Sequence, residues 1–160
     1  MSFNIRKASA HDLLCIDKLI RRSARVLQLQ YYGESEIEAA LELVKGIDEL
    51  IDANSYFVAE SKMAIVGCGG FYIDLPEPKK AEIRAFFVSP EFARQGIAAQ
   101  ILACCETHCR KIGVESLYLT ATLSGETFYK KYGFVKVDKF KKNLSDDIKF
   151  ELVKMEKYLI

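Results

Sequence analysis

The chain lacks the sequence features that mark membrane-spanning, secreted and strongly charged proteins. Nowhere among its 160 residues do about 18 apolar residues follow one another, as a membrane-spanning helix would need. The first residues contain no apolar segment of signal-peptide length. The 23 basic residues nearly balance the 22 acidic ones, so no general affinity for nucleic acid or acidic membranes is expected. We therefore expect a cytoplasmic protein with neither nucleic acid nor membrane among its partners.

A disulfide framework is also lacking. The five cysteines are odd in number, and three of them fall in the segment "CCETHC", where a helical pattern keeps neighbours from pairing. Cys104 with His108, and Cys105 with Cys109, could each share a helix face, but the two faces point about 100° apart. Zinc sites draw their ligands mostly from two separated elements. The sequence thus predicts free thiols in a reducing compartment and no metal site.

Hydrophobic periodicity predicts one α+β domain over residues 1–160. No repeat, low-complexity segment or linker interrupts the chain, and its length suits a single domain. Capping boxes at Ser9 and Ser35 mark the first two helix starts, and a short "IDELIDA" segment follows Gly46. The expected order is β-α-α-β-β-β-α-β-α-β-β, with strands over 3–8, 55–61, 63–74, 81–89, 114–122, 134–140 and 148–158, and later helices over 96–112 and 124–132.

The turn "VSPEFARQGIAAQ" joins a predicted strand to a predicted helix. A helix start carries unpaired N–H groups and a partial positive charge. Gly96, Ala98 and Ala99 add little side-chain bulk there, so an anion such as a phosphate can reach the amides directly. The alternative is structural: Gly96 turns the chain and the alanines allow close packing of the helix.

This turn resembles the cofactor motif of the GNAT superfamily of N-acetyltransferases, which take acetyl groups from acetyl-CoA. That motif reads [RQ]-x-x-G-x-[GA], typically after Val-x-Pro, and Val88, Pro90, Gly96 and Ala98 match it. The first motif position is Ala93 in place of Arg or Gln, and an arginine, Arg94, follows one residue later. Either that arginine takes over the side-chain role or the site does without it.

A second stretch, "TLSGETFYKKYGF", resembles another signature of the same family, Asn-x-x-Ala-x-x-Phe-Tyr-x-x-x-Gly-Phe. The matching residues are Phe128, Tyr129, Gly133 and Phe134. Thr122 and Gly125 stand where Asn and Ala are common. Together the two motifs and the element order cover about residues 55–140.

The resemblance implies an α/β/α sandwich, with a mixed, mostly antiparallel sheet of about seven strands flanked by about four helices. The parallel strands 81–88 and 114–121 would splay apart, and the pantetheine arm of acetyl-CoA would fill the gap and pair with the backbone of Phe86 and Val88. The pyrophosphate would lie on the amides of residues 95–99. The expected cofactor-binding residues are Phe86, Phe87, Val88, Arg94, Gln95, Gly96, Ile97, Ala98, Ala99, Thr122 and Tyr129.

The resemblance also implies acetyl transfer to a primary amine of a small molecule or peptide, by direct attack in a ternary complex. Tyr129 is the candidate general acid, because a phenol with a pKa of about 10 stays protonated at neutral pH; its alternative role is packing beside Phe128. The N–H of Val88 would stabilise the developing oxyanion. Glu82 is the candidate base, on a face predicted to include Arg84, Phe86 and Val88. An ion pair with the arginine is the alternative role of Glu82, and the alternative bases are Glu60, Asp74, Tyr72 or a water molecule.

The acceptor amine cannot be named from the sequence. Tyr31, Tyr32 and Tyr72 are the candidate substrate-binding residues, from the first two helices and the hairpin tip. A basic patch near the end of the chain is expected to be solvated surface, with contact to the adenosine 3′-phosphate as the minor alternative: Lys136, Lys139, Lys141 and Lys142. A catalytically silent acyl-CoA-binding module of the same fold remains the alternative function, and a homodimer through the last strand is left open.

Overall fold

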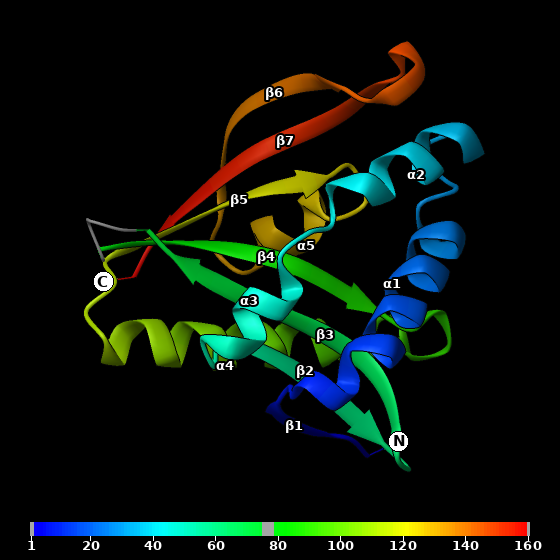
Figure 1. Ribbon diagram of the computed structural model, residues 1–160. Coiled ribbons are helices and arrows are strands. Elements are labelled where there is room, and N and C mark those ends of the chain that lie inside the picture. The colour runs from blue at the N-terminus through cyan, green and yellow to red at the C-terminus, as the bar shows by residue number, and fades with distance from the viewer. Residues whose placement is uncertain (1, 75–78, 160) are drawn as a thin grey trace.

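The computed structural model describes residues 2–74 and 79–159 of the chain, and its seven strands form one mixed sheet (Figure 1). The strand order is β1-β2-β3-β4-β5-β7-β6, and only β4 and β5 run parallel. The seven predicted strands are all present within a few residues of their expected ends. They are β1 (Asn4–Lys7), β2 (Tyr56–Ser61), β3 (Ala64–Ile73), β4 (Lys80–Val88), β5 (Ser116–Thr122), β6 (Val135–Asn143) and β7 (Lys149–Tyr158).

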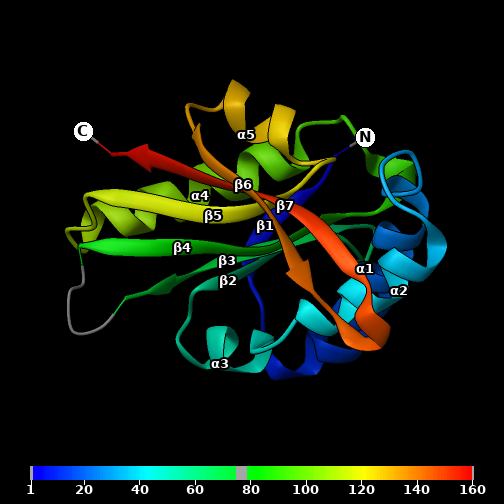
Figure 2. The ribbon, with the colours of Figure 1, turned by 90° about the horizontal axis from the view of Figure 1, so that it is seen from above.

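Helices cover both faces of the sheet, so the predicted α/β/α sandwich is confirmed (Figure 2). One face carries α1 (Leu13–Leu27), α2 (Glu34–Ala40) and α3 (Ile47–Asp52), and the other carries α4 (Ile97–Lys111) and α5 (Glu126–Lys131). There are five α-helices in the described residues where about four were expected. The additional one is the short α3, which buries Leu50 and Ile51 after the left-handed Gly46 (φ 76°).

The predicted start of the second helix is wrong by a few residues. Gly33 is the N-cap of α2, and its N–H donates to the Glu36 carboxylate at 2.8 Å. Glu38, expected to belong to a box with Ser35, instead pairs with Arg25 of α1 at 2.8 Å. The first box is as predicted, since the N–H of Ser9 donates to Asp12 at 2.8 Å. Glu36 and Glu38 each lie three residues after a possible N-cap, Gly33 or Ser35, so the sequence alone could not decide between the two helix starts.

A tight contact brings α4 close to the sheet. Ile97, Ile101 and Cys105 of α4 are almost fully buried against β2–β5. Gly67 of β3 makes the approach possible, because a Cβ at that position would clash with the Ile97 side chain. The beginning of α4 is thus fixed beside the ends of β3 and β4.

The parallel pair β4–β5 splays apart, as the family resemblance implies. Backbone pairing joins Lys80 to Ser116, Ala81 to Leu117 and Glu82 to Tyr118, and it goes no further. Both strands nevertheless continue, to Val88 and Thr122. Figure 1 shows them close together at one end and separated at the other.

A bulge at Ala85 resets the side-chain alternation of β4. Ala85 has a φ of 55°, and the pairing of β3 with β4 shifts register at this point. Beyond it, Phe86 and Val88 pack into the core under α4, together with Ile83. The expectation that Glu82 and Arg84 share a face with Phe86 and Val88 is therefore wrong, because the extra residue moves them to opposite faces.

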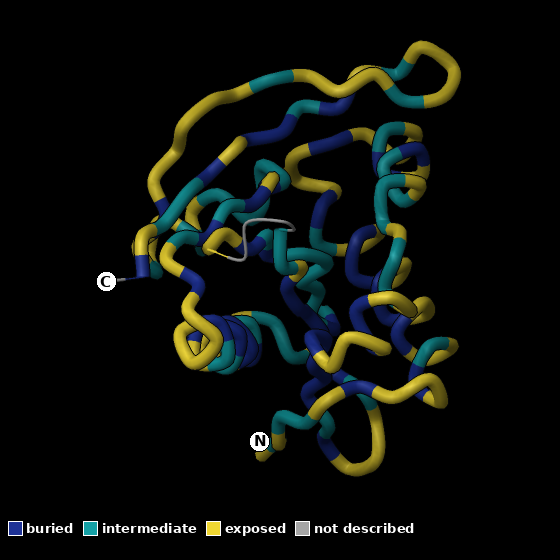
Figure 3. The backbone as a smooth tube through the Cα atoms, turned by 60° about the vertical axis from the view of Figure 1, so that its left-hand side comes forward, coloured by how far each residue is buried: buried dark blue, intermediate teal, exposed yellow. Residues whose placement is uncertain are grey.

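The last strand has no free edge. It pairs with β5 over Ser116–Thr122 and with β6 over Val135–Asn143. A homodimer cannot add a strand there, because β6 is the edge of the sheet on that side. Figure 3 shows β6 as a largely exposed segment.

Candidate active site

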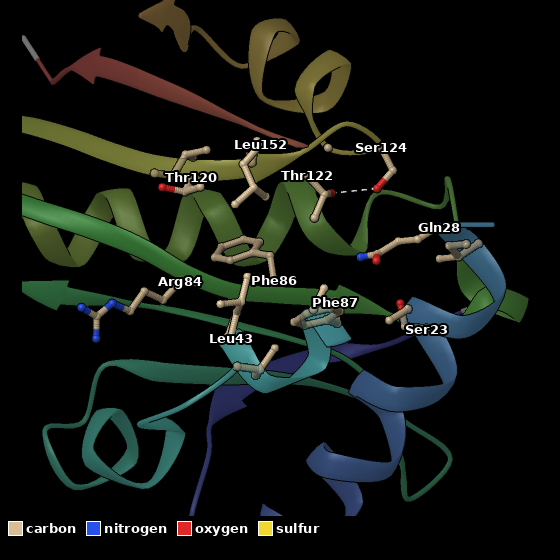
Figure 4. Close-up of a pocket in the computed structure, with 18 of the residues that line it drawn as sticks. Ser23, Gln28, Leu43, Arg84, Phe86, Phe87, Thr120, Thr122, Ser124 and Leu152 are labelled. Atoms are coloured by element: carbon tan, nitrogen blue, oxygen red, sulfur yellow. Dashed lines mark hydrogen bonds between the residues drawn. The ribbon is translucent and has the colours of Figure 1, made fainter. Parts of the chain in front are cut away.

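The gap between β4 and β5 opens into a cavity of about 720 Å³ (Figure 4). Its floor is the splayed part of the two strands. Its walls come from α1, α2 and the segment after it, the start of α4, α5, and the β6–β7 hairpin. The hairpin is tied to the α2 side, where the Ser145 hydroxyl donates to the Glu42 carboxylate at 2.6 Å. The cavity therefore reaches both faces of the sheet through the split between its parallel strands.

The last residues of β4 present their backbone to this gap. Phe86, Phe87 and Val88 all line the cavity. The N–H of Ser89 donates to the Val66 carbonyl of β3 at 2.8 Å, and Val88 lies opposite Gly67. Because the hydrogen-bonding direction alternates along an antiparallel ladder, the Val88 amide points away from β3, toward the gap.

The turn before α4 has the geometry of an anion site. Gly96 is the N-cap residue, with a φ of 85°, and space is open where a Cβ would stand. No main-chain amide from residue 94 to residue 99 donates a hydrogen bond within the described part of the chain. Arg94 is exposed, adopts a φ of 62° and lines the cavity with Ala93 and Ala98. Free amides and a positively charged side chain thus converge where the motif predicted them.

Three other predicted cofactor residues contribute less through their side chains. Ile97 is buried in the core, so only its amide faces the turn. The Gln95 side chain donates to the carbonyl of Glu91 at 3.3 Å. Ala99 lies half-buried on α4 outside the cavity lining.

A brace that the sequence did not reveal holds this turn to α1. Arg22 forms a bidentate ion pair with Glu91, whose carboxylate also accepts a hydrogen bond from the Ser89 hydroxyl at 2.6 Å. These contacts lower the pKa of Glu91 to about 2, first through Arg22 and then through Ser89. A lone Arg and a lone Glu 69 residues apart carry no local signal, so only the fold brings them together.

Tyr129 lies at the cavity wall on α5. Its ring packs at 5.0 Å from Phe128, 5.5 Å from Phe134 and 6.3 Å from Phe86, measured between ring centroids. Its hydroxyl has no hydrogen-bond partner in residues 2–74 and 79–159. Burial raises its pKa above the usual value, so the phenol keeps its proton. Thr122 also lines the cavity, and its hydroxyl is paired with that of Ser124 at 2.8 Å.

Glu82 stands where the two parallel strands separate, and it lines the cavity. Its carboxylate lies 2.5 Å from Nε of Arg84. The guanidinium of Arg84 in turn lies 4.4 Å from the centre of the Tyr72 ring. The ion pair that was the alternative for Glu82 is therefore present.

The family comparison agrees with this geometry. The sequence profile of the acetyltransferase (GNAT) domain matches residues 28–159. The chain belongs to the GNAT acetyltransferase family. No curated protein sequence matches the chain significantly.

Solved structures share the GNAT fold over the whole chain. The PaiA N-acetyltransferase of Thermoplasma acidophilum, in complex with coenzyme A, is 22% identical, with a TM-score of 0.76 and 99% of each chain covered. Ard1 of Thermoplasma volcanium is 24% identical, with a TM-score of 0.72 over 100% of this chain and 99% of that one. N-acetylglutamate synthase of Neisseria gonorrhoeae, with coenzyme A and N-acetyl-glutamate, is 20% identical, with a TM-score of 0.67 over 100% of this chain and 36% of that one. At these identities the likeness shows the fold alone.

The three tyrosines expected at the substrate site do not line the cavity of this GNAT protein. Tyr31 is exposed, and Tyr72 lies under Arg84 outside the lining. Tyr32 is buried: its hydroxyl donates to the Glu151 carbonyl at 2.6 Å and accepts the N–H of Leu123 at 2.8 Å. Its ring stacks on Phe150 with centroids 4.0 Å apart. Tyr32 therefore fastens the α1–α2 connection to β7 and to the end of β5.

The "CCETHC" segment belongs to α4. Cys105 and Cys109 are buried in the core, and Sγ of Cys104 lies 3.9 Å from Nδ1 of His108. Burial raises the pKa of Cys109 to about 12. Within the described residues, no group of three or more His, Cys, Asp and Glu side chains is placed to hold a metal ion. No helix in the same residues is long and apolar enough to cross a membrane.

The predicted basic patch lies along β6. Lys139 pairs with Glu151 at 3.3 Å, and Lys136 lies 4.0 Å from Glu126. Lys142 alone of the four lines the cavity. All four lysines are exposed, two of them have acidic partners, and one lines the cavity.

Proposed function

We propose that the protein transfers the acetyl group of acetyl-CoA to a primary amine, by direct attack in a ternary complex. The observation that carries the proposal is the end of the β4–β5 ladder at Glu82 and Tyr118, followed by free main-chain amides at the start of α4. The family membership supports acyl transfer from coenzyme A, and two structural neighbours contain coenzyme A.

The residues around the gap suit an extended thioester with a diphosphate. Phe86 and Val88 would offer backbone groups to a pantetheine arm, as a neighbouring strand would. The amides of residues 95–99 and the Arg94 guanidinium would hold the diphosphate. Thr122, on the facing strand, bounds the gap on its other side. Acetyl-CoA supplies an acetyl group already activated as a thioester.

Each step of the transfer has a candidate residue in this chain. The amine must attack in its neutral form, and Glu82 would accept its surplus proton directly or through a water molecule. The Val88 amide would donate to the carbonyl oxygen as negative charge develops on it. Tyr129 would protonate the sulfur as the carbon–sulfur bond breaks. Because burial keeps Tyr129 protonated, it is ready to act as an acid at neutral pH.

The test is amine-dependent release of coenzyme A. The protein is mixed with acetyl-CoA and a broad panel of amines, and both free thiol and the acetylated product are measured. We expect steady turnover with at least one amine. Tight binding of acetyl-CoA with no turnover across the panel would support the silent acyl-CoA-binding module instead.

The cysteines support a reducing compartment such as the cytoplasm. All five are free thiols: Cys15, Cys68, Cys104, Cys105 and Cys109. Three of them are buried in the packed core, where oxidation to a disulfide would require the fold to open.

A further inference from the structure

Two buried polar side chains, Ser23 of α1 and its C-cap residue Gln28, have no hydrogen-bond partner in the part of the chain that the structure describes. Ser23 is 4% exposed and Gln28 is 9% exposed, and both line the cavity. Neither the Ser23 hydroxyl nor the Gln28 amide takes part in a hydrogen bond within residues 2–74 and 79–159. In those residues every fully enclosed side-chain nitrogen or oxygen does have a partner. The free groups of Ser23 and Gln28 are therefore accessible, and both residues line the cavity; Figure 4 shows them at the C-terminal part of α1 and just after it, on the side of Phe87.

Several polar side chains near the pair do have partners, whereas the Tyr129 hydroxyl on α5, like Ser23 and Gln28, has none in the described residues. Tyr32, a few residues further along, uses its hydroxyl twice, and Thr122 and Ser124 bond to one another at 2.8 Å. Their polar atoms are not fully enclosed, so water in the open cavity can solvate them. A ligand that displaced this water without bonding to them would leave each group unpartnered, at a cost of about 1–3 kcal/mol. Ser23 and Gln28 thus have the properties of groups reserved for a ligand.

The surroundings of the pair are hydrocarbon. The cavity wall on this face of the sheet is formed by Leu27, Leu41, Leu43, Phe87, Phe140 and Leu152. A ligand that fills this wall gains from burying an apolar body, at about 25 cal/mol for each Å² removed from water. The two polar groups then fix its orientation.

The charges at the cavity disfavour a second cation on the ligand. The charged residues that line it are Lys45, Glu82, Arg84, Arg94 and Lys142. Glu82 is the only carboxylate among them, and it is already paired with Arg84. Lys45 and Lys142 form no ion pair in the described part of the chain, so they leave positive charge at the mouth of the cavity. An amine with further ammonium groups would meet repulsion there.

We infer that the acceptor is a primary amine with an apolar body and one carbonyl group, which Ser23 and Gln28 bind, and that it is not a polyamine. The inference rests on the proposed acetyl transfer. The Gln28 amide can donate one hydrogen bond and accept another, and the Ser23 hydroxyl can donate to a carbonyl oxygen. A carboxamide or peptide-like group is complementary to that set, whereas a hydrocarbon chain would leave both groups unpaired.

The test compares two acceptors that differ only in a carboxamide group beside the amine, phenylalaninamide and phenethylamine. We expect the ratio of their kcat/KM values to fall tenfold or more in Gln28→Met, and less in Ser23→Ala, relative to the unmodified protein. Using a ratio cancels the different basicities of the two amines and any general damage to the enzyme. Gln30→Met is the matched control. Gln30 is an exposed glutamine two residues further along the chain, and its variant should keep the original ratio. An unchanged ratio in Gln28→Met overturns the inference.

Calorimetry separates this inference from the proposed function. Phenylalaninamide is titrated into the protein saturated with coenzyme A, which carries no acetyl group to transfer. Binding that weakens tenfold in Gln28→Met supports the acceptor site, even if acetyl-CoA gives no turnover and the transferase proposal fails. Turnover with a ratio indifferent to Gln28 leaves the transferase standing and removes the acceptor inference. A kcat/KM for spermidine above that for phenylalaninamide also overturns it.

Discussion

The two halves of β4 differ in their hydrogen-bonding partners. From Lys80 to Glu82 the strand pairs with β3 on one side and with β5 on the other, and Ala81 is fully buried. From Ile83 to Val88 it keeps β3 but has no strand on the β5 side, and it contains the bulge at Ala85. The first half is ordinary sheet interior. The second half is a strand with one hydrogen-bonding edge turned to a cavity.

The difference shows how a sheet can hold an extended ligand. An unpaired edge in the interior of a protein leaves amides and carbonyls without partners, which is costly unless something replaces the missing strand. Here the bulge lies in the open half of the strand, and the start of α4 brings free main-chain amides to its end. We expect changes in the open half to alter ligand binding and turnover, and changes that only affect packing to alter stability.

The sharpest test of the open end is Gly96→Glu. A carboxylate at the start of α4 would repel a diphosphate; like charges about 4 Å apart cost several kcal/mol even at the surface. We therefore expect the affinity for acetyl-CoA to fall by roughly 100-fold or more. Isothermal titration with acetyl-CoA measures the change directly.

Gly113 supplies the matched control at the other end of α4. It has a φ of 87°, and space is open where its Cβ would stand, as at Gly96 (φ 85°). Gly113→Glu therefore introduces the same backbone strain and the same charge, but away from the cavity. Both variants should lose similar stability, and only Gly96→Glu should lose acetyl-CoA binding. Equal affinities in the two variants would remove the anion site from the open half.

Tyr129→Phe tests the chemistry at the cavity wall. Loss of a general acid lowers turnover by about 100-fold, so kcat should fall by about that factor while binding of acetyl-CoA changes little. Since burial raises the pKa of Tyr129, its acid form persists through the alkaline range, and its ionisation should cause no fall in kcat below about pH 10. The control is Tyr132→Phe. Tyr132 is the C-cap residue of α5 and lies outside the cavity lining. Equal kcat values in both variants would leave Tyr129 with a packing role.

Glu82→Gln tests the point at which the two halves of β4 meet. If Glu82 accepts the proton of the amine, its loss should lower the rate about tenfold at neutral pH, and the rising limb of the rate profile should move to higher pH, where the amine is neutral without help. Arg84→Gln breaks the same ion pair but keeps the carboxylate. A profile that superimposes on that of the unmodified protein would assign Glu82 to the ion pair alone.

The fold was predictable because its signals are local. Alternation and β-rich runs between turn residues predicted all seven strands, and the helical stripe of Ile97, Ile101 and Cys105 predicted α4. The open turn before α4 was predictable too, since Gly96 and Ala98 have a fixed spacing from the end of β4; that it binds an anion stays a prediction. The faces of β4 were predictable only in part: the break in alternation at Phe86-Phe87-Val88 fits either a bulge or a buried segment, and nothing in the sequence marks Ala85 for a φ of 55°.

The acceptor side of the site was the least predictable part. Tyr31, Tyr32 and Tyr72 were predicted from their residue type alone. The Tyr32 hydroxyl, however, already bonds to the backbone carbonyl of Glu151 and the backbone N–H of Leu123. Ser23 and Gln28 matter because they have no partners in the described residues, and whether a polar side chain finds a partner depends on the tertiary fold. The available signal was weak: Ser23 is a polar residue among the buried positions of α1, where Ile16, Leu19 and Ile20 are apolar, and the buried Gln28 follows at its C-cap.

The smallest expected effect concerns the bulge that divides β4. The hydroxyl of the fully buried Tyr56 donates to the Ala85 carbonyl at 2.7 Å, and the Cys68 thiol lies 3.8 Å from the same oxygen. Tyr56→Phe should lower the free energy of unfolding by about 1–2 kcal/mol, because it leaves that carbonyl with only the weak thiol contact. Urea unfolding measures this change, with the exposed Tyr31→Phe as the control.

Adding Ala85→Gly to Tyr56→Phe should recover part of the lost stability, since glycine adopts a positive φ without strain. If the double variant is no more stable than Tyr56→Phe alone, residue 85 no longer adopts a positive φ once the tyrosine hydroxyl is lost. The bulge in β4 would then depend on this one hydrogen bond.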